Sequence, residues 1–530
     1  MKKINIIGLG LILLLTGGCK KFLDVNSNPN GPSSADPALY LPSIETNFAT
    51  GMQFDARGLA PYVQNFLNST AGAAWDTHGY SKSSDFGGEM WRSAYWKSGQ
   101  NTVDVIEAAR TQKKWDILGA GLALQAWGWQ MLTDMHGPII LKEAFDPARN
   151  TFDYDPQDTV YAYVDRLCKE ALVQLEKGTD AVGSPLFAKF DIMYKGDRDK
   201  WKKFVYGLLA INAHHLIKKP NYNADAVISY VDKSLAGNAD DALIPFLGTS
   251  SADGNFFGPQ RGNVGIFGQS AFIVRLMDGS IFNGVRDPRL PLMLQPSTDA
   301  VYRGLTAGLG QSSTLNTAAN GVRSLWGTTL GSNTVAATTP SKYLFQNNAP
   351  FPLMTYAMLQ FIKAEAALKK SDMTLAFDAY KKGVNAHLDF VRDGAKGPGA
   401  TLGGSGYIFT SDPVAIASFN TQKALYLANA SVIPATANSL TLSQIMLQKY
   451  IALWAHGTIE TWTDLRKFDY DPNIFTSFAL PTVYFIDNNN KPAYRVRPRY
   501  NSEYIWNIDA LKAVGGFDAD YHTLKLWIHQ

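Results

Sequence analysis

Residues 353–391 have the sequence LMTYAMLQFIKAEAALKKSDMTLAFDAYKKGVNAHLDFV, which contains two apolar patterns with the period of an α-helix. The apolar positions of the two halves are Met354, Met358, Phe361, Ile362 and Ala366, followed by Ala376, Tyr380, Val384 and Leu388. Ser371 and Asp372 interrupt the pattern, and an aspartate at this place caps the second helix. Two helices joined by so short a link predict an antiparallel helical hairpin.

The chain contains further pairs of helical patterns. Small residues at Ala364, Ala367 and Ala376, together with Tyr380, resemble those of a tetratricopeptide (TPR) repeat. The other predicted pairs are Trp115–Met131 with Val160–Glu176, Trp201–Lys218 with Ala224–Leu235, and Leu442–His456 with Thr458–Lys467. Their spacing is irregular, so we predict a fold dominated by α-helices, with about four TPR-like hairpins rather than a regular solenoid. Further helices are expected at Leu39–Gly51, Leu59–Leu67 and Trp91–Arg110.

Long segments without a helical pattern separate these pairs. The segment Gly248–Pro340 is dense in Gly, Ser, Thr and Asn, and a second insertion at about 393–440 begins with a Gly-rich stretch. Loops of this length inside a domain are uncommon and are often functional. Because a rigid scaffold positions its loops, binding residues are expected there, within one domain spanning 38–530.

The first nineteen residues, MKKINIIGLGLILLLTGGC, have a positive start, a short apolar run and small residues before a cysteine. This pattern predicts a signal peptide over residues 1–18, because the apolar run is too short to span a membrane. Acylation of Cys19 would then anchor the chain to a membrane, with residues 19–37 as a polar tether. The alternative is an ordinary signal peptide followed by a chance cysteine.

Composition excludes several classes of protein. With 46% hydrophobic and 18% charged residues, the chain is typical of a globular protein. Of its 49 basic and 46 acidic side chains, two lysines lie in residues 1–18, so the remaining chain is almost neutral and offers no basic surface for nucleic acid. Cys168 lies in a helical pattern and is expected to be a buried apolar residue.

No catalytic or metal-binding motif stands out. The sequence contains no HExxH, GxxxxGK[ST] or CxxC motif, and no GxSxG motif placed after a strand. His214 and His215 are adjacent on a helix, so we expect one of them to be packed and one exposed. Four carboxylates near predicted turns, Asp134, Asp146, Asp153 and Asp155, are explained by turn and capping roles. We predict no cofactor, although an incidental structural calcium remains an alternative.

Loop aromatics are the best candidates for ligand contacts, because sugar rings stack on flat side chains while their hydroxyls bind polar neighbours. The candidate binding residues are Trp75 with Asp76, His78 and Tyr80, then Trp326 with Arg323, and then Tyr407. For each aromatic the alternative is a structural anchor that packs on the helices. By contrast, Trp91, Trp127, Trp129 and Trp454 have helical spacing and are expected in the core.

Five segments together resemble the SusD/RagB family of outer-membrane lipoproteins. These segments are KFLDVNSNPN (21–30), MHGPIILKEAF (135–145), RDPRL (286–290), MTYAMLQFIKAEAAL (354–368) and IMLQKYIALWAHGTIETWTDLRKF (445–468). The resemblance implies a right-handed superhelix of four TPR-like hairpins carrying ligand loops. It also implies a cell-surface protein that is not an enzyme and that passes a nutrient, usually a glycan and sometimes a peptide, to a partner SusC-like TonB-dependent transporter.

The residues leave other functions open. An exported enzyme would turn over a glycan, and a helical-repeat scaffold would organise other proteins without a small ligand. A glycan-binding screen combined with a turnover assay separates these functions from nutrient binding.

Overall fold

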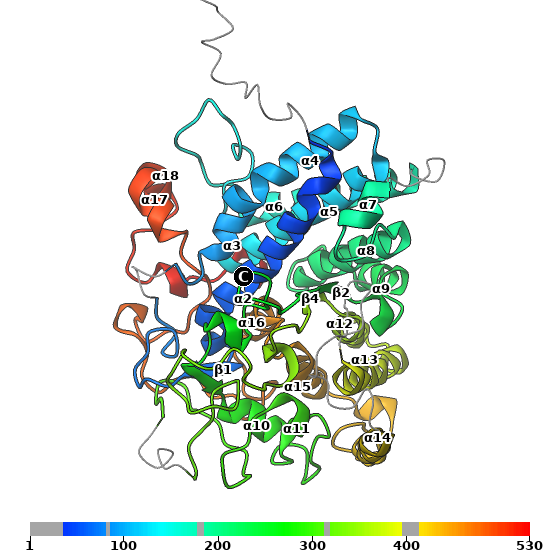
Figure 1. Ribbon diagram of the computed structural model, residues 1–530, viewed down its shortest axis with the longest axis vertical. Coiled ribbons are helices and arrows are strands. Elements are labelled where there is room, and N and C mark those ends of the chain that lie inside the picture. The colour runs from blue at the N-terminus through cyan, green and yellow to red at the C-terminus, as the bar shows by residue number, and fades with distance from the viewer. Residues whose placement is uncertain (1–34, 81–84, 178–184, 312–318, 395–412) are drawn as a thin grey trace, which may run out of the picture.

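The computed structural model describes residues 35–80, 85–177, 185–311, 319–394 and 413–530. Cys19, the predicted signal peptide, most of the tether and Tyr407 lie outside these ranges. Helices dominate the described chain, which confirms the predicted fold class (Figure 1). The longer helices are α2 (Leu41–Tyr62), α4 (Gly99–Thr111), α5 (Trp115–His136), α6 (Gln157–Lys177), α8 (Arg198–His215), α9 (Ala224–Lys233), α12 (Tyr356–Lys369), α13 (Met373–Asp393), α14 (Pro413–Ala428), α15 (Leu442–Leu453) and α16 (Thr458–Lys467).

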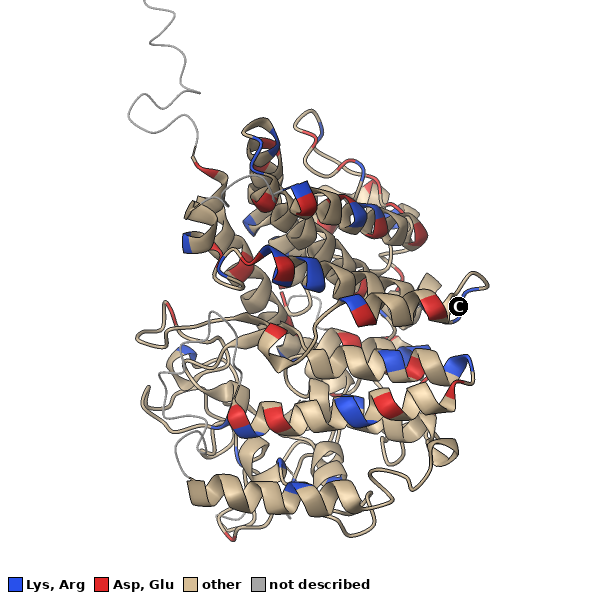
Figure 2. Ribbon diagram, turned by 90° about the vertical axis from the view of Figure 1, so that its right-hand side faces the viewer, with Lys and Arg blue, Asp and Glu red and all other residues tan. Residues whose placement is uncertain are grey.

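Four helical hairpins form the scaffold, as predicted. Helices α5 and α6, α8 and α9, α12 and α13, and α15 and α16 pack as pairs. Successive pairs also touch, because α6 packs on α8, α9 on α12 and α12 on α15 (Figure 1). The hairpins therefore stack in the order of the chain. On one side of this scaffold, Figure 2 shows acidic and basic residues interspersed along the outer helices.

The hairpin α12–α13 is built as its sequence predicts. The hydroxyl of Thr355 accepts a hydrogen bond from the backbone N–H of Met358 and begins α12, while the Asp372 carboxylate caps α13 through Leu375 N–H. Phe361 is fully buried, and its ring lies so close to Gly383 that a Cβ there would be 3.0 Å from it.

Short elements connect the scaffold. The first small sheet pairs β1 (Phe66–Asn68) with β3 (Phe267–Gln269), and the second pairs β2 (Ala242–Ile244) with β4 (Phe351–Met354), both antiparallel. The short helices are α3 (Glu89–Arg92), α7 (Pro185–Phe190), α10 (Ala271–Met277), α11 (Leu290–Met293), α17 (Tyr500–Trp506) and α18 (Ile508–Ala513). The sequence did not predict α14, which lies within the second insertion.

The two short helices predicted at 39–51 and 59–67 are one helix, α2. The polar and glycine-rich middle of α2 made the sequence look broken, but those residues serve packing. The carboxylate of Asp55 accepts hydrogen bonds from the backbone N–H groups of Glu89 and Met90, at 3.0 and 2.8 Å, at the start of α3. At Gly58 a Cβ would lie 3.2 Å from the ring of Trp75.

A buried network of ionisable side chains joins the four hairpins. Its members are Asp134 (α5), Tyr161 (α6), His214 and His215 (α8), Glu365 (α12), Lys449 (α15), and Glu460, Asp464 and Lys467 (α16). His214 Nε2 lies 2.8 Å from a Glu365 oxygen, and His215 Nε2 lies 2.8 Å from a Glu460 oxygen. Burial lowers the pKa of His215, but the charges of Asp134 and Glu460 outweigh it and raise that pKa to about 9.

The prediction that one of the two adjacent histidines is exposed is therefore wrong. Neighbouring residues of a helix point about 100° apart, but α8 is covered on several sides, by α5, α6, α9 and α12. Both imidazoles are buried as a result. Asp134, which the sequence placed near a turn, is instead an inward-facing residue of α5 in the same network.

Candidate functional site

The predicted loop aromatic Trp75 is buried. Only 7% of it is exposed, and its ring contacts those of Tyr62, Tyr80 and Phe86, with centroids 5.4, 4.9 and 6.4 Å away. The Trp75 ring therefore does not face solvent. The loop folds back on α2, where Gly58 leaves room for the indole. The structure therefore favours the alternative, in which Trp75 is a structural anchor.

The polar neighbours of Trp75 hold the same loop in place. Asp76 accepts a hydrogen bond from the backbone N–H of Asn68 at 3.0 Å, and burial raises the pKa of Asp76 to about 8. His78 Nδ1 accepts from the backbone N–H of Ala493 at 3.2 Å, and burial lowers the pKa of His78 to about 3. Tyr80 is also buried. These side chains tie the loop to β1 and to the C-terminal segment.

The second pair of predicted binding residues, Trp326 and Arg323, does not lie together at the surface. Trp326 is fully buried, and its indole N–H donates to the backbone carbonyl of Phe257 at 2.7 Å. Arg323 is partly exposed, and its guanidinium donates to the hydroxyl of Thr298. The structure thus places Trp326 in the core and Arg323 at the surface of the first insertion.

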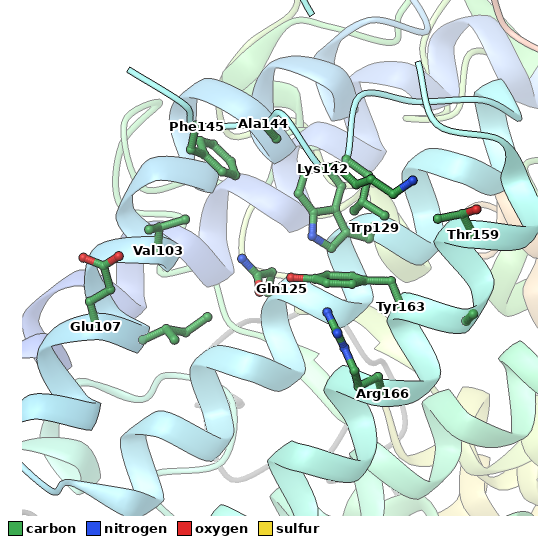
Figure 3. Close-up of a pocket in the computed structure, with 13 residues that line it drawn as sticks. Val103, Glu107, Gln125, Trp129, Lys142, Ala144, Phe145, Thr159, Tyr163 and Arg166 are labelled. Atoms are coloured by element: carbon green, nitrogen blue, oxygen red, sulfur yellow. The ribbon is translucent and has the colours of Figure 1, made fainter. Parts of the chain in front are cut away.

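A pocket of about 880 Å³ opens between α4, α5, α6 and the segment after α5 (Figure 3). This volume lies within the range of small-molecule sites, about 300–1,000 Å³. Each helix contributes residues three or four positions apart, which share one helical face. They are Val103, Ile106 and Glu107 from α4, Gln125 and Trp129 from α5, and Thr159, Tyr163 and Arg166 from α6.

Aromatic faces and polar groups alternate on the pocket wall. In Figure 3 the hydroxyl of Tyr163 points towards Gln125, and the side chain of Arg166 lies below the face of the ring. The Arg166 guanidinium lies 4.6 Å from the centroid of the Tyr163 ring. This arrangement provides ring faces for an apolar surface and both donors and acceptors for hydroxyl groups.

Trp129 carries an unused hydrogen-bond donor at this wall. The residue is 4% exposed, and within the described chain its indole Nε1 has no hydrogen-bond partner. Figure 3 shows that nitrogen on the side of the ring that faces Gln125 and Tyr163. A buried donor without a partner costs about 1–3 kcal/mol. The nitrogen itself is enclosed, so a ligand oxygen reaches it only if a neighbouring side chain moves.

The segment after α5 closes one side of the pocket. Gly137, with φ of +81°, ends α5, and the carboxylate of Asp155 then accepts from the backbone N–H groups of Leu141 and Lys142 at 3.1 and 2.8 Å. Phe145 follows with φ of +69°, a region that residues with a Cβ rarely adopt. Its ring lies 6.2 Å from that of Trp129. Such backbone strain is often found at functional sites.

The sequence did not indicate this pocket. Trp129 was expected in the core, and most of its surface is indeed buried there. The available signal was Gln125, a polar residue on the apolar helix 115–131 and one turn before Trp129. Only the packing of the helices places Tyr163 and Arg166 of α6 opposite Gln125 and Trp129 of α5.

Neither membrane-spanning helices nor metal clusters occur in the described ranges. Among these residues no helix is long and apolar enough to cross a membrane. The same part of the chain contains no group of three or more His, Cys, Asp or Glu residues placed to hold a metal ion.

A family model for SusD-like proteins, described as starch-binding associating with outer membrane, matches residues 29–497. A SusD/RagB family protein from Bacteroides thetaiotaomicron has a similar fold, with 21% identity and a TM-score of 0.68 over 94% of this chain and 99% of that chain. A chitin-binding SusD homologue from Flavobacterium johnsoniae has 20% identity and a TM-score of 0.67, over 93% of this chain and 97% of that chain. No curated protein matches the chain.

Proposed function

The chain belongs to the SusD-like family, and on that premise we propose that it is a cell-surface lipoprotein that captures an oligosaccharide or polysaccharide. Cys19 carries the lipid that anchors it to the outer membrane. A SusC-like TonB-dependent transporter is the partner that receives the glycan. The protein itself performs no chemistry on its ligand.

The pocket between α4, α5 and α6 is the proposed glycan site. The observation that carries this assignment is the ring of Tyr163 on the pocket wall, with its hydroxyl directed towards Gln125 and the Arg166 guanidinium 4.6 Å from its centroid. A sugar presents apolar C–H faces, which suit the aromatic rings, and hydroxyl oxygens, which suit the N–H donors of Gln125 and Arg166. The family description and the chitin-binding relative support a glycan as the ligand.

Binding and turnover should be measured together on starch-derived and chitin-derived oligosaccharides. The full chain is expected to bind one of these series without cleaving it. Tyr163→Ala should weaken binding by roughly 5–150-fold, because a stacked ring contributes about 1–3 kcal/mol of apolar burial. Tyr163→Phe, which keeps the ring, is the matched control and should retain most of the affinity.

Three results would contradict the proposal. Turnover of the glycan indicates an enzyme, and binding only to peptides indicates a peptide-uptake protein of the same fold. If Tyr163→Ala binds a glycan as tightly as the unmodified chain, the ligand lies elsewhere. Arg323 and Tyr407 of the two insertions are then the proposed contacts to test next.

A further inference from the structure

A second pocket adjoins the proposed glycan site. It has a volume of about 420 Å³ and shares two lining residues, Ala144 and Phe145, with the larger pocket. Its other walls come from α3, from the π-helical segment η2 (Ser93–Lys97) and from α17. The two pockets therefore meet along the segment that follows α5.

Trp96 presents an open aromatic face at the second pocket. The residue is 70% exposed, and the guanidinium of Arg92 lies 5.1 Å from the centroid of its ring. Glu89 holds that guanidinium through an ion pair of 2.9 Å. Trp96 lies on the single π-helical turn of η2, and such turns are frequent at functional sites.

The polar groups of this pocket are fixed in position. One carboxylate oxygen of Glu503 accepts from the hydroxyl of Tyr154 at 2.8 Å and from the amide of Asn507 at 2.9 Å. The hydroxyl of Ser502 donates to the other oxygen at 3.0 Å. A preorganised carboxylate beside an exposed indole suits a sugar ring, which has hydroxyl donors on its edge and an apolar face.

Phe145 stands at the junction of the two pockets. Its ring lies 6.2 Å from that of Trp129 in the larger pocket and 6.5 Å from that of Tyr95 in the smaller one. The left-handed backbone conformation of Phe145 places the ring between them. A ligand that occupied both pockets would cross this ring.

We infer that the two pockets form one groove for an extended oligosaccharide, running from Tyr163 across Phe145 to Trp96. This inference rests on the proposed function and specifies its ligand as a chain of several sugars. The larger pocket binds the first units, and Trp96 stacks on a later one. Affinity therefore rises with chain length beyond the disaccharide, and the increase depends on Trp96.

The test is a titration of the full chain with a series from disaccharide to hexasaccharide of whichever glycan it binds. The unmodified protein should bind the hexasaccharide at least about tenfold more tightly than the disaccharide. Trp96→Ala should abolish this gain and leave the disaccharide affinity unchanged. Trp506→Ala is the matched control, because Trp506 is 74% exposed but does not line either pocket.

The possible failures are distinguishable. If no oligosaccharide of the series binds, the proposed function is wrong. If the disaccharide binds but longer chains bind no more tightly, the function stands and the groove is refuted. Trp96→Ala also overturns the inference if it leaves the hexasaccharide affinity intact, or if it weakens the disaccharide equally. Trp96 is largely solvent-exposed, so the melting temperature of this variant should match that of Trp506→Ala.

Discussion

Replacement of Trp75 by alanine tests whether this residue is an anchor or a ligand platform. A buried aromatic side chain removes about 150–250 Å² from water, which at about 25 cal/mol per Å² corresponds to roughly 4–6 kcal/mol as an upper bound. Truncation of a buried Phe or Trp to alanine usually costs about 3–5 kcal/mol, and we expect Trp75→Ala to lower the free energy of unfolding by that amount. The loss comes from its packing against Tyr62, Tyr80 and Phe86.

Urea titration followed by circular dichroism measures this loss, and glycan binding is measured at a temperature where the variant remains folded. Trp506→Ala serves as the exposed control and should change stability by less than about 0.5 kcal/mol. Binding by Trp75→Ala should equal that of the unmodified chain. The reasoning is refuted if Trp75→Ala has the same free energy of unfolding as the unmodified chain but binds glycan much more weakly. Trp75 would then contact the ligand.

Three further predictions concern the network, the hairpin and the anchor. The pKa of His215 is raised to about 9 in the folded chain against about 6.5 unfolded, so its contribution is complete below about pH 6.5 and is lost as the pH rises through 9. Unfolding free energies between pH 6 and 9.5 should fall by up to about 3 kcal/mol more for the unmodified chain than for His215→Gln, and parallel curves would exclude this role. Phe361→Ala should cost about 3–5 kcal/mol in a denaturant titration, and a cost under about 1 kcal/mol would contradict its full burial. Cys19→Ala should abolish labelling by a fatty-acid probe and release the protein from the membrane fraction, whereas continued labelling would disprove lipidation at Cys19.

Local patterns predicted the scaffold well because each hairpin carries its own signal. Residues 353–391 have helical periodicity and a capping aspartate within one short stretch, so their fold depends little on the rest of the chain. The same argument failed for α2. Its buried Asp55 accepts a hydrogen bond from the start of α3, and its Gly58 packs against Trp75. Both partners lie outside the helix, so its own sequence does not show them.

The sequence by itself determined the helical hairpins, their order, the core tryptophans and the resemblance to a family, because helical periodicity and caps are local properties. Only the tertiary structure decided which aromatics face solvent. Trp75 and Trp96 are both followed by polar residues in the sequence, yet one is enclosed by rings from α2 and its own loop while the other is open. The two pockets of the proposed groove likewise combine residues of α4, α5, α6 and α17, which are up to about 400 positions apart in the chain. Burial depends on such distant neighbours, and no local pattern records them.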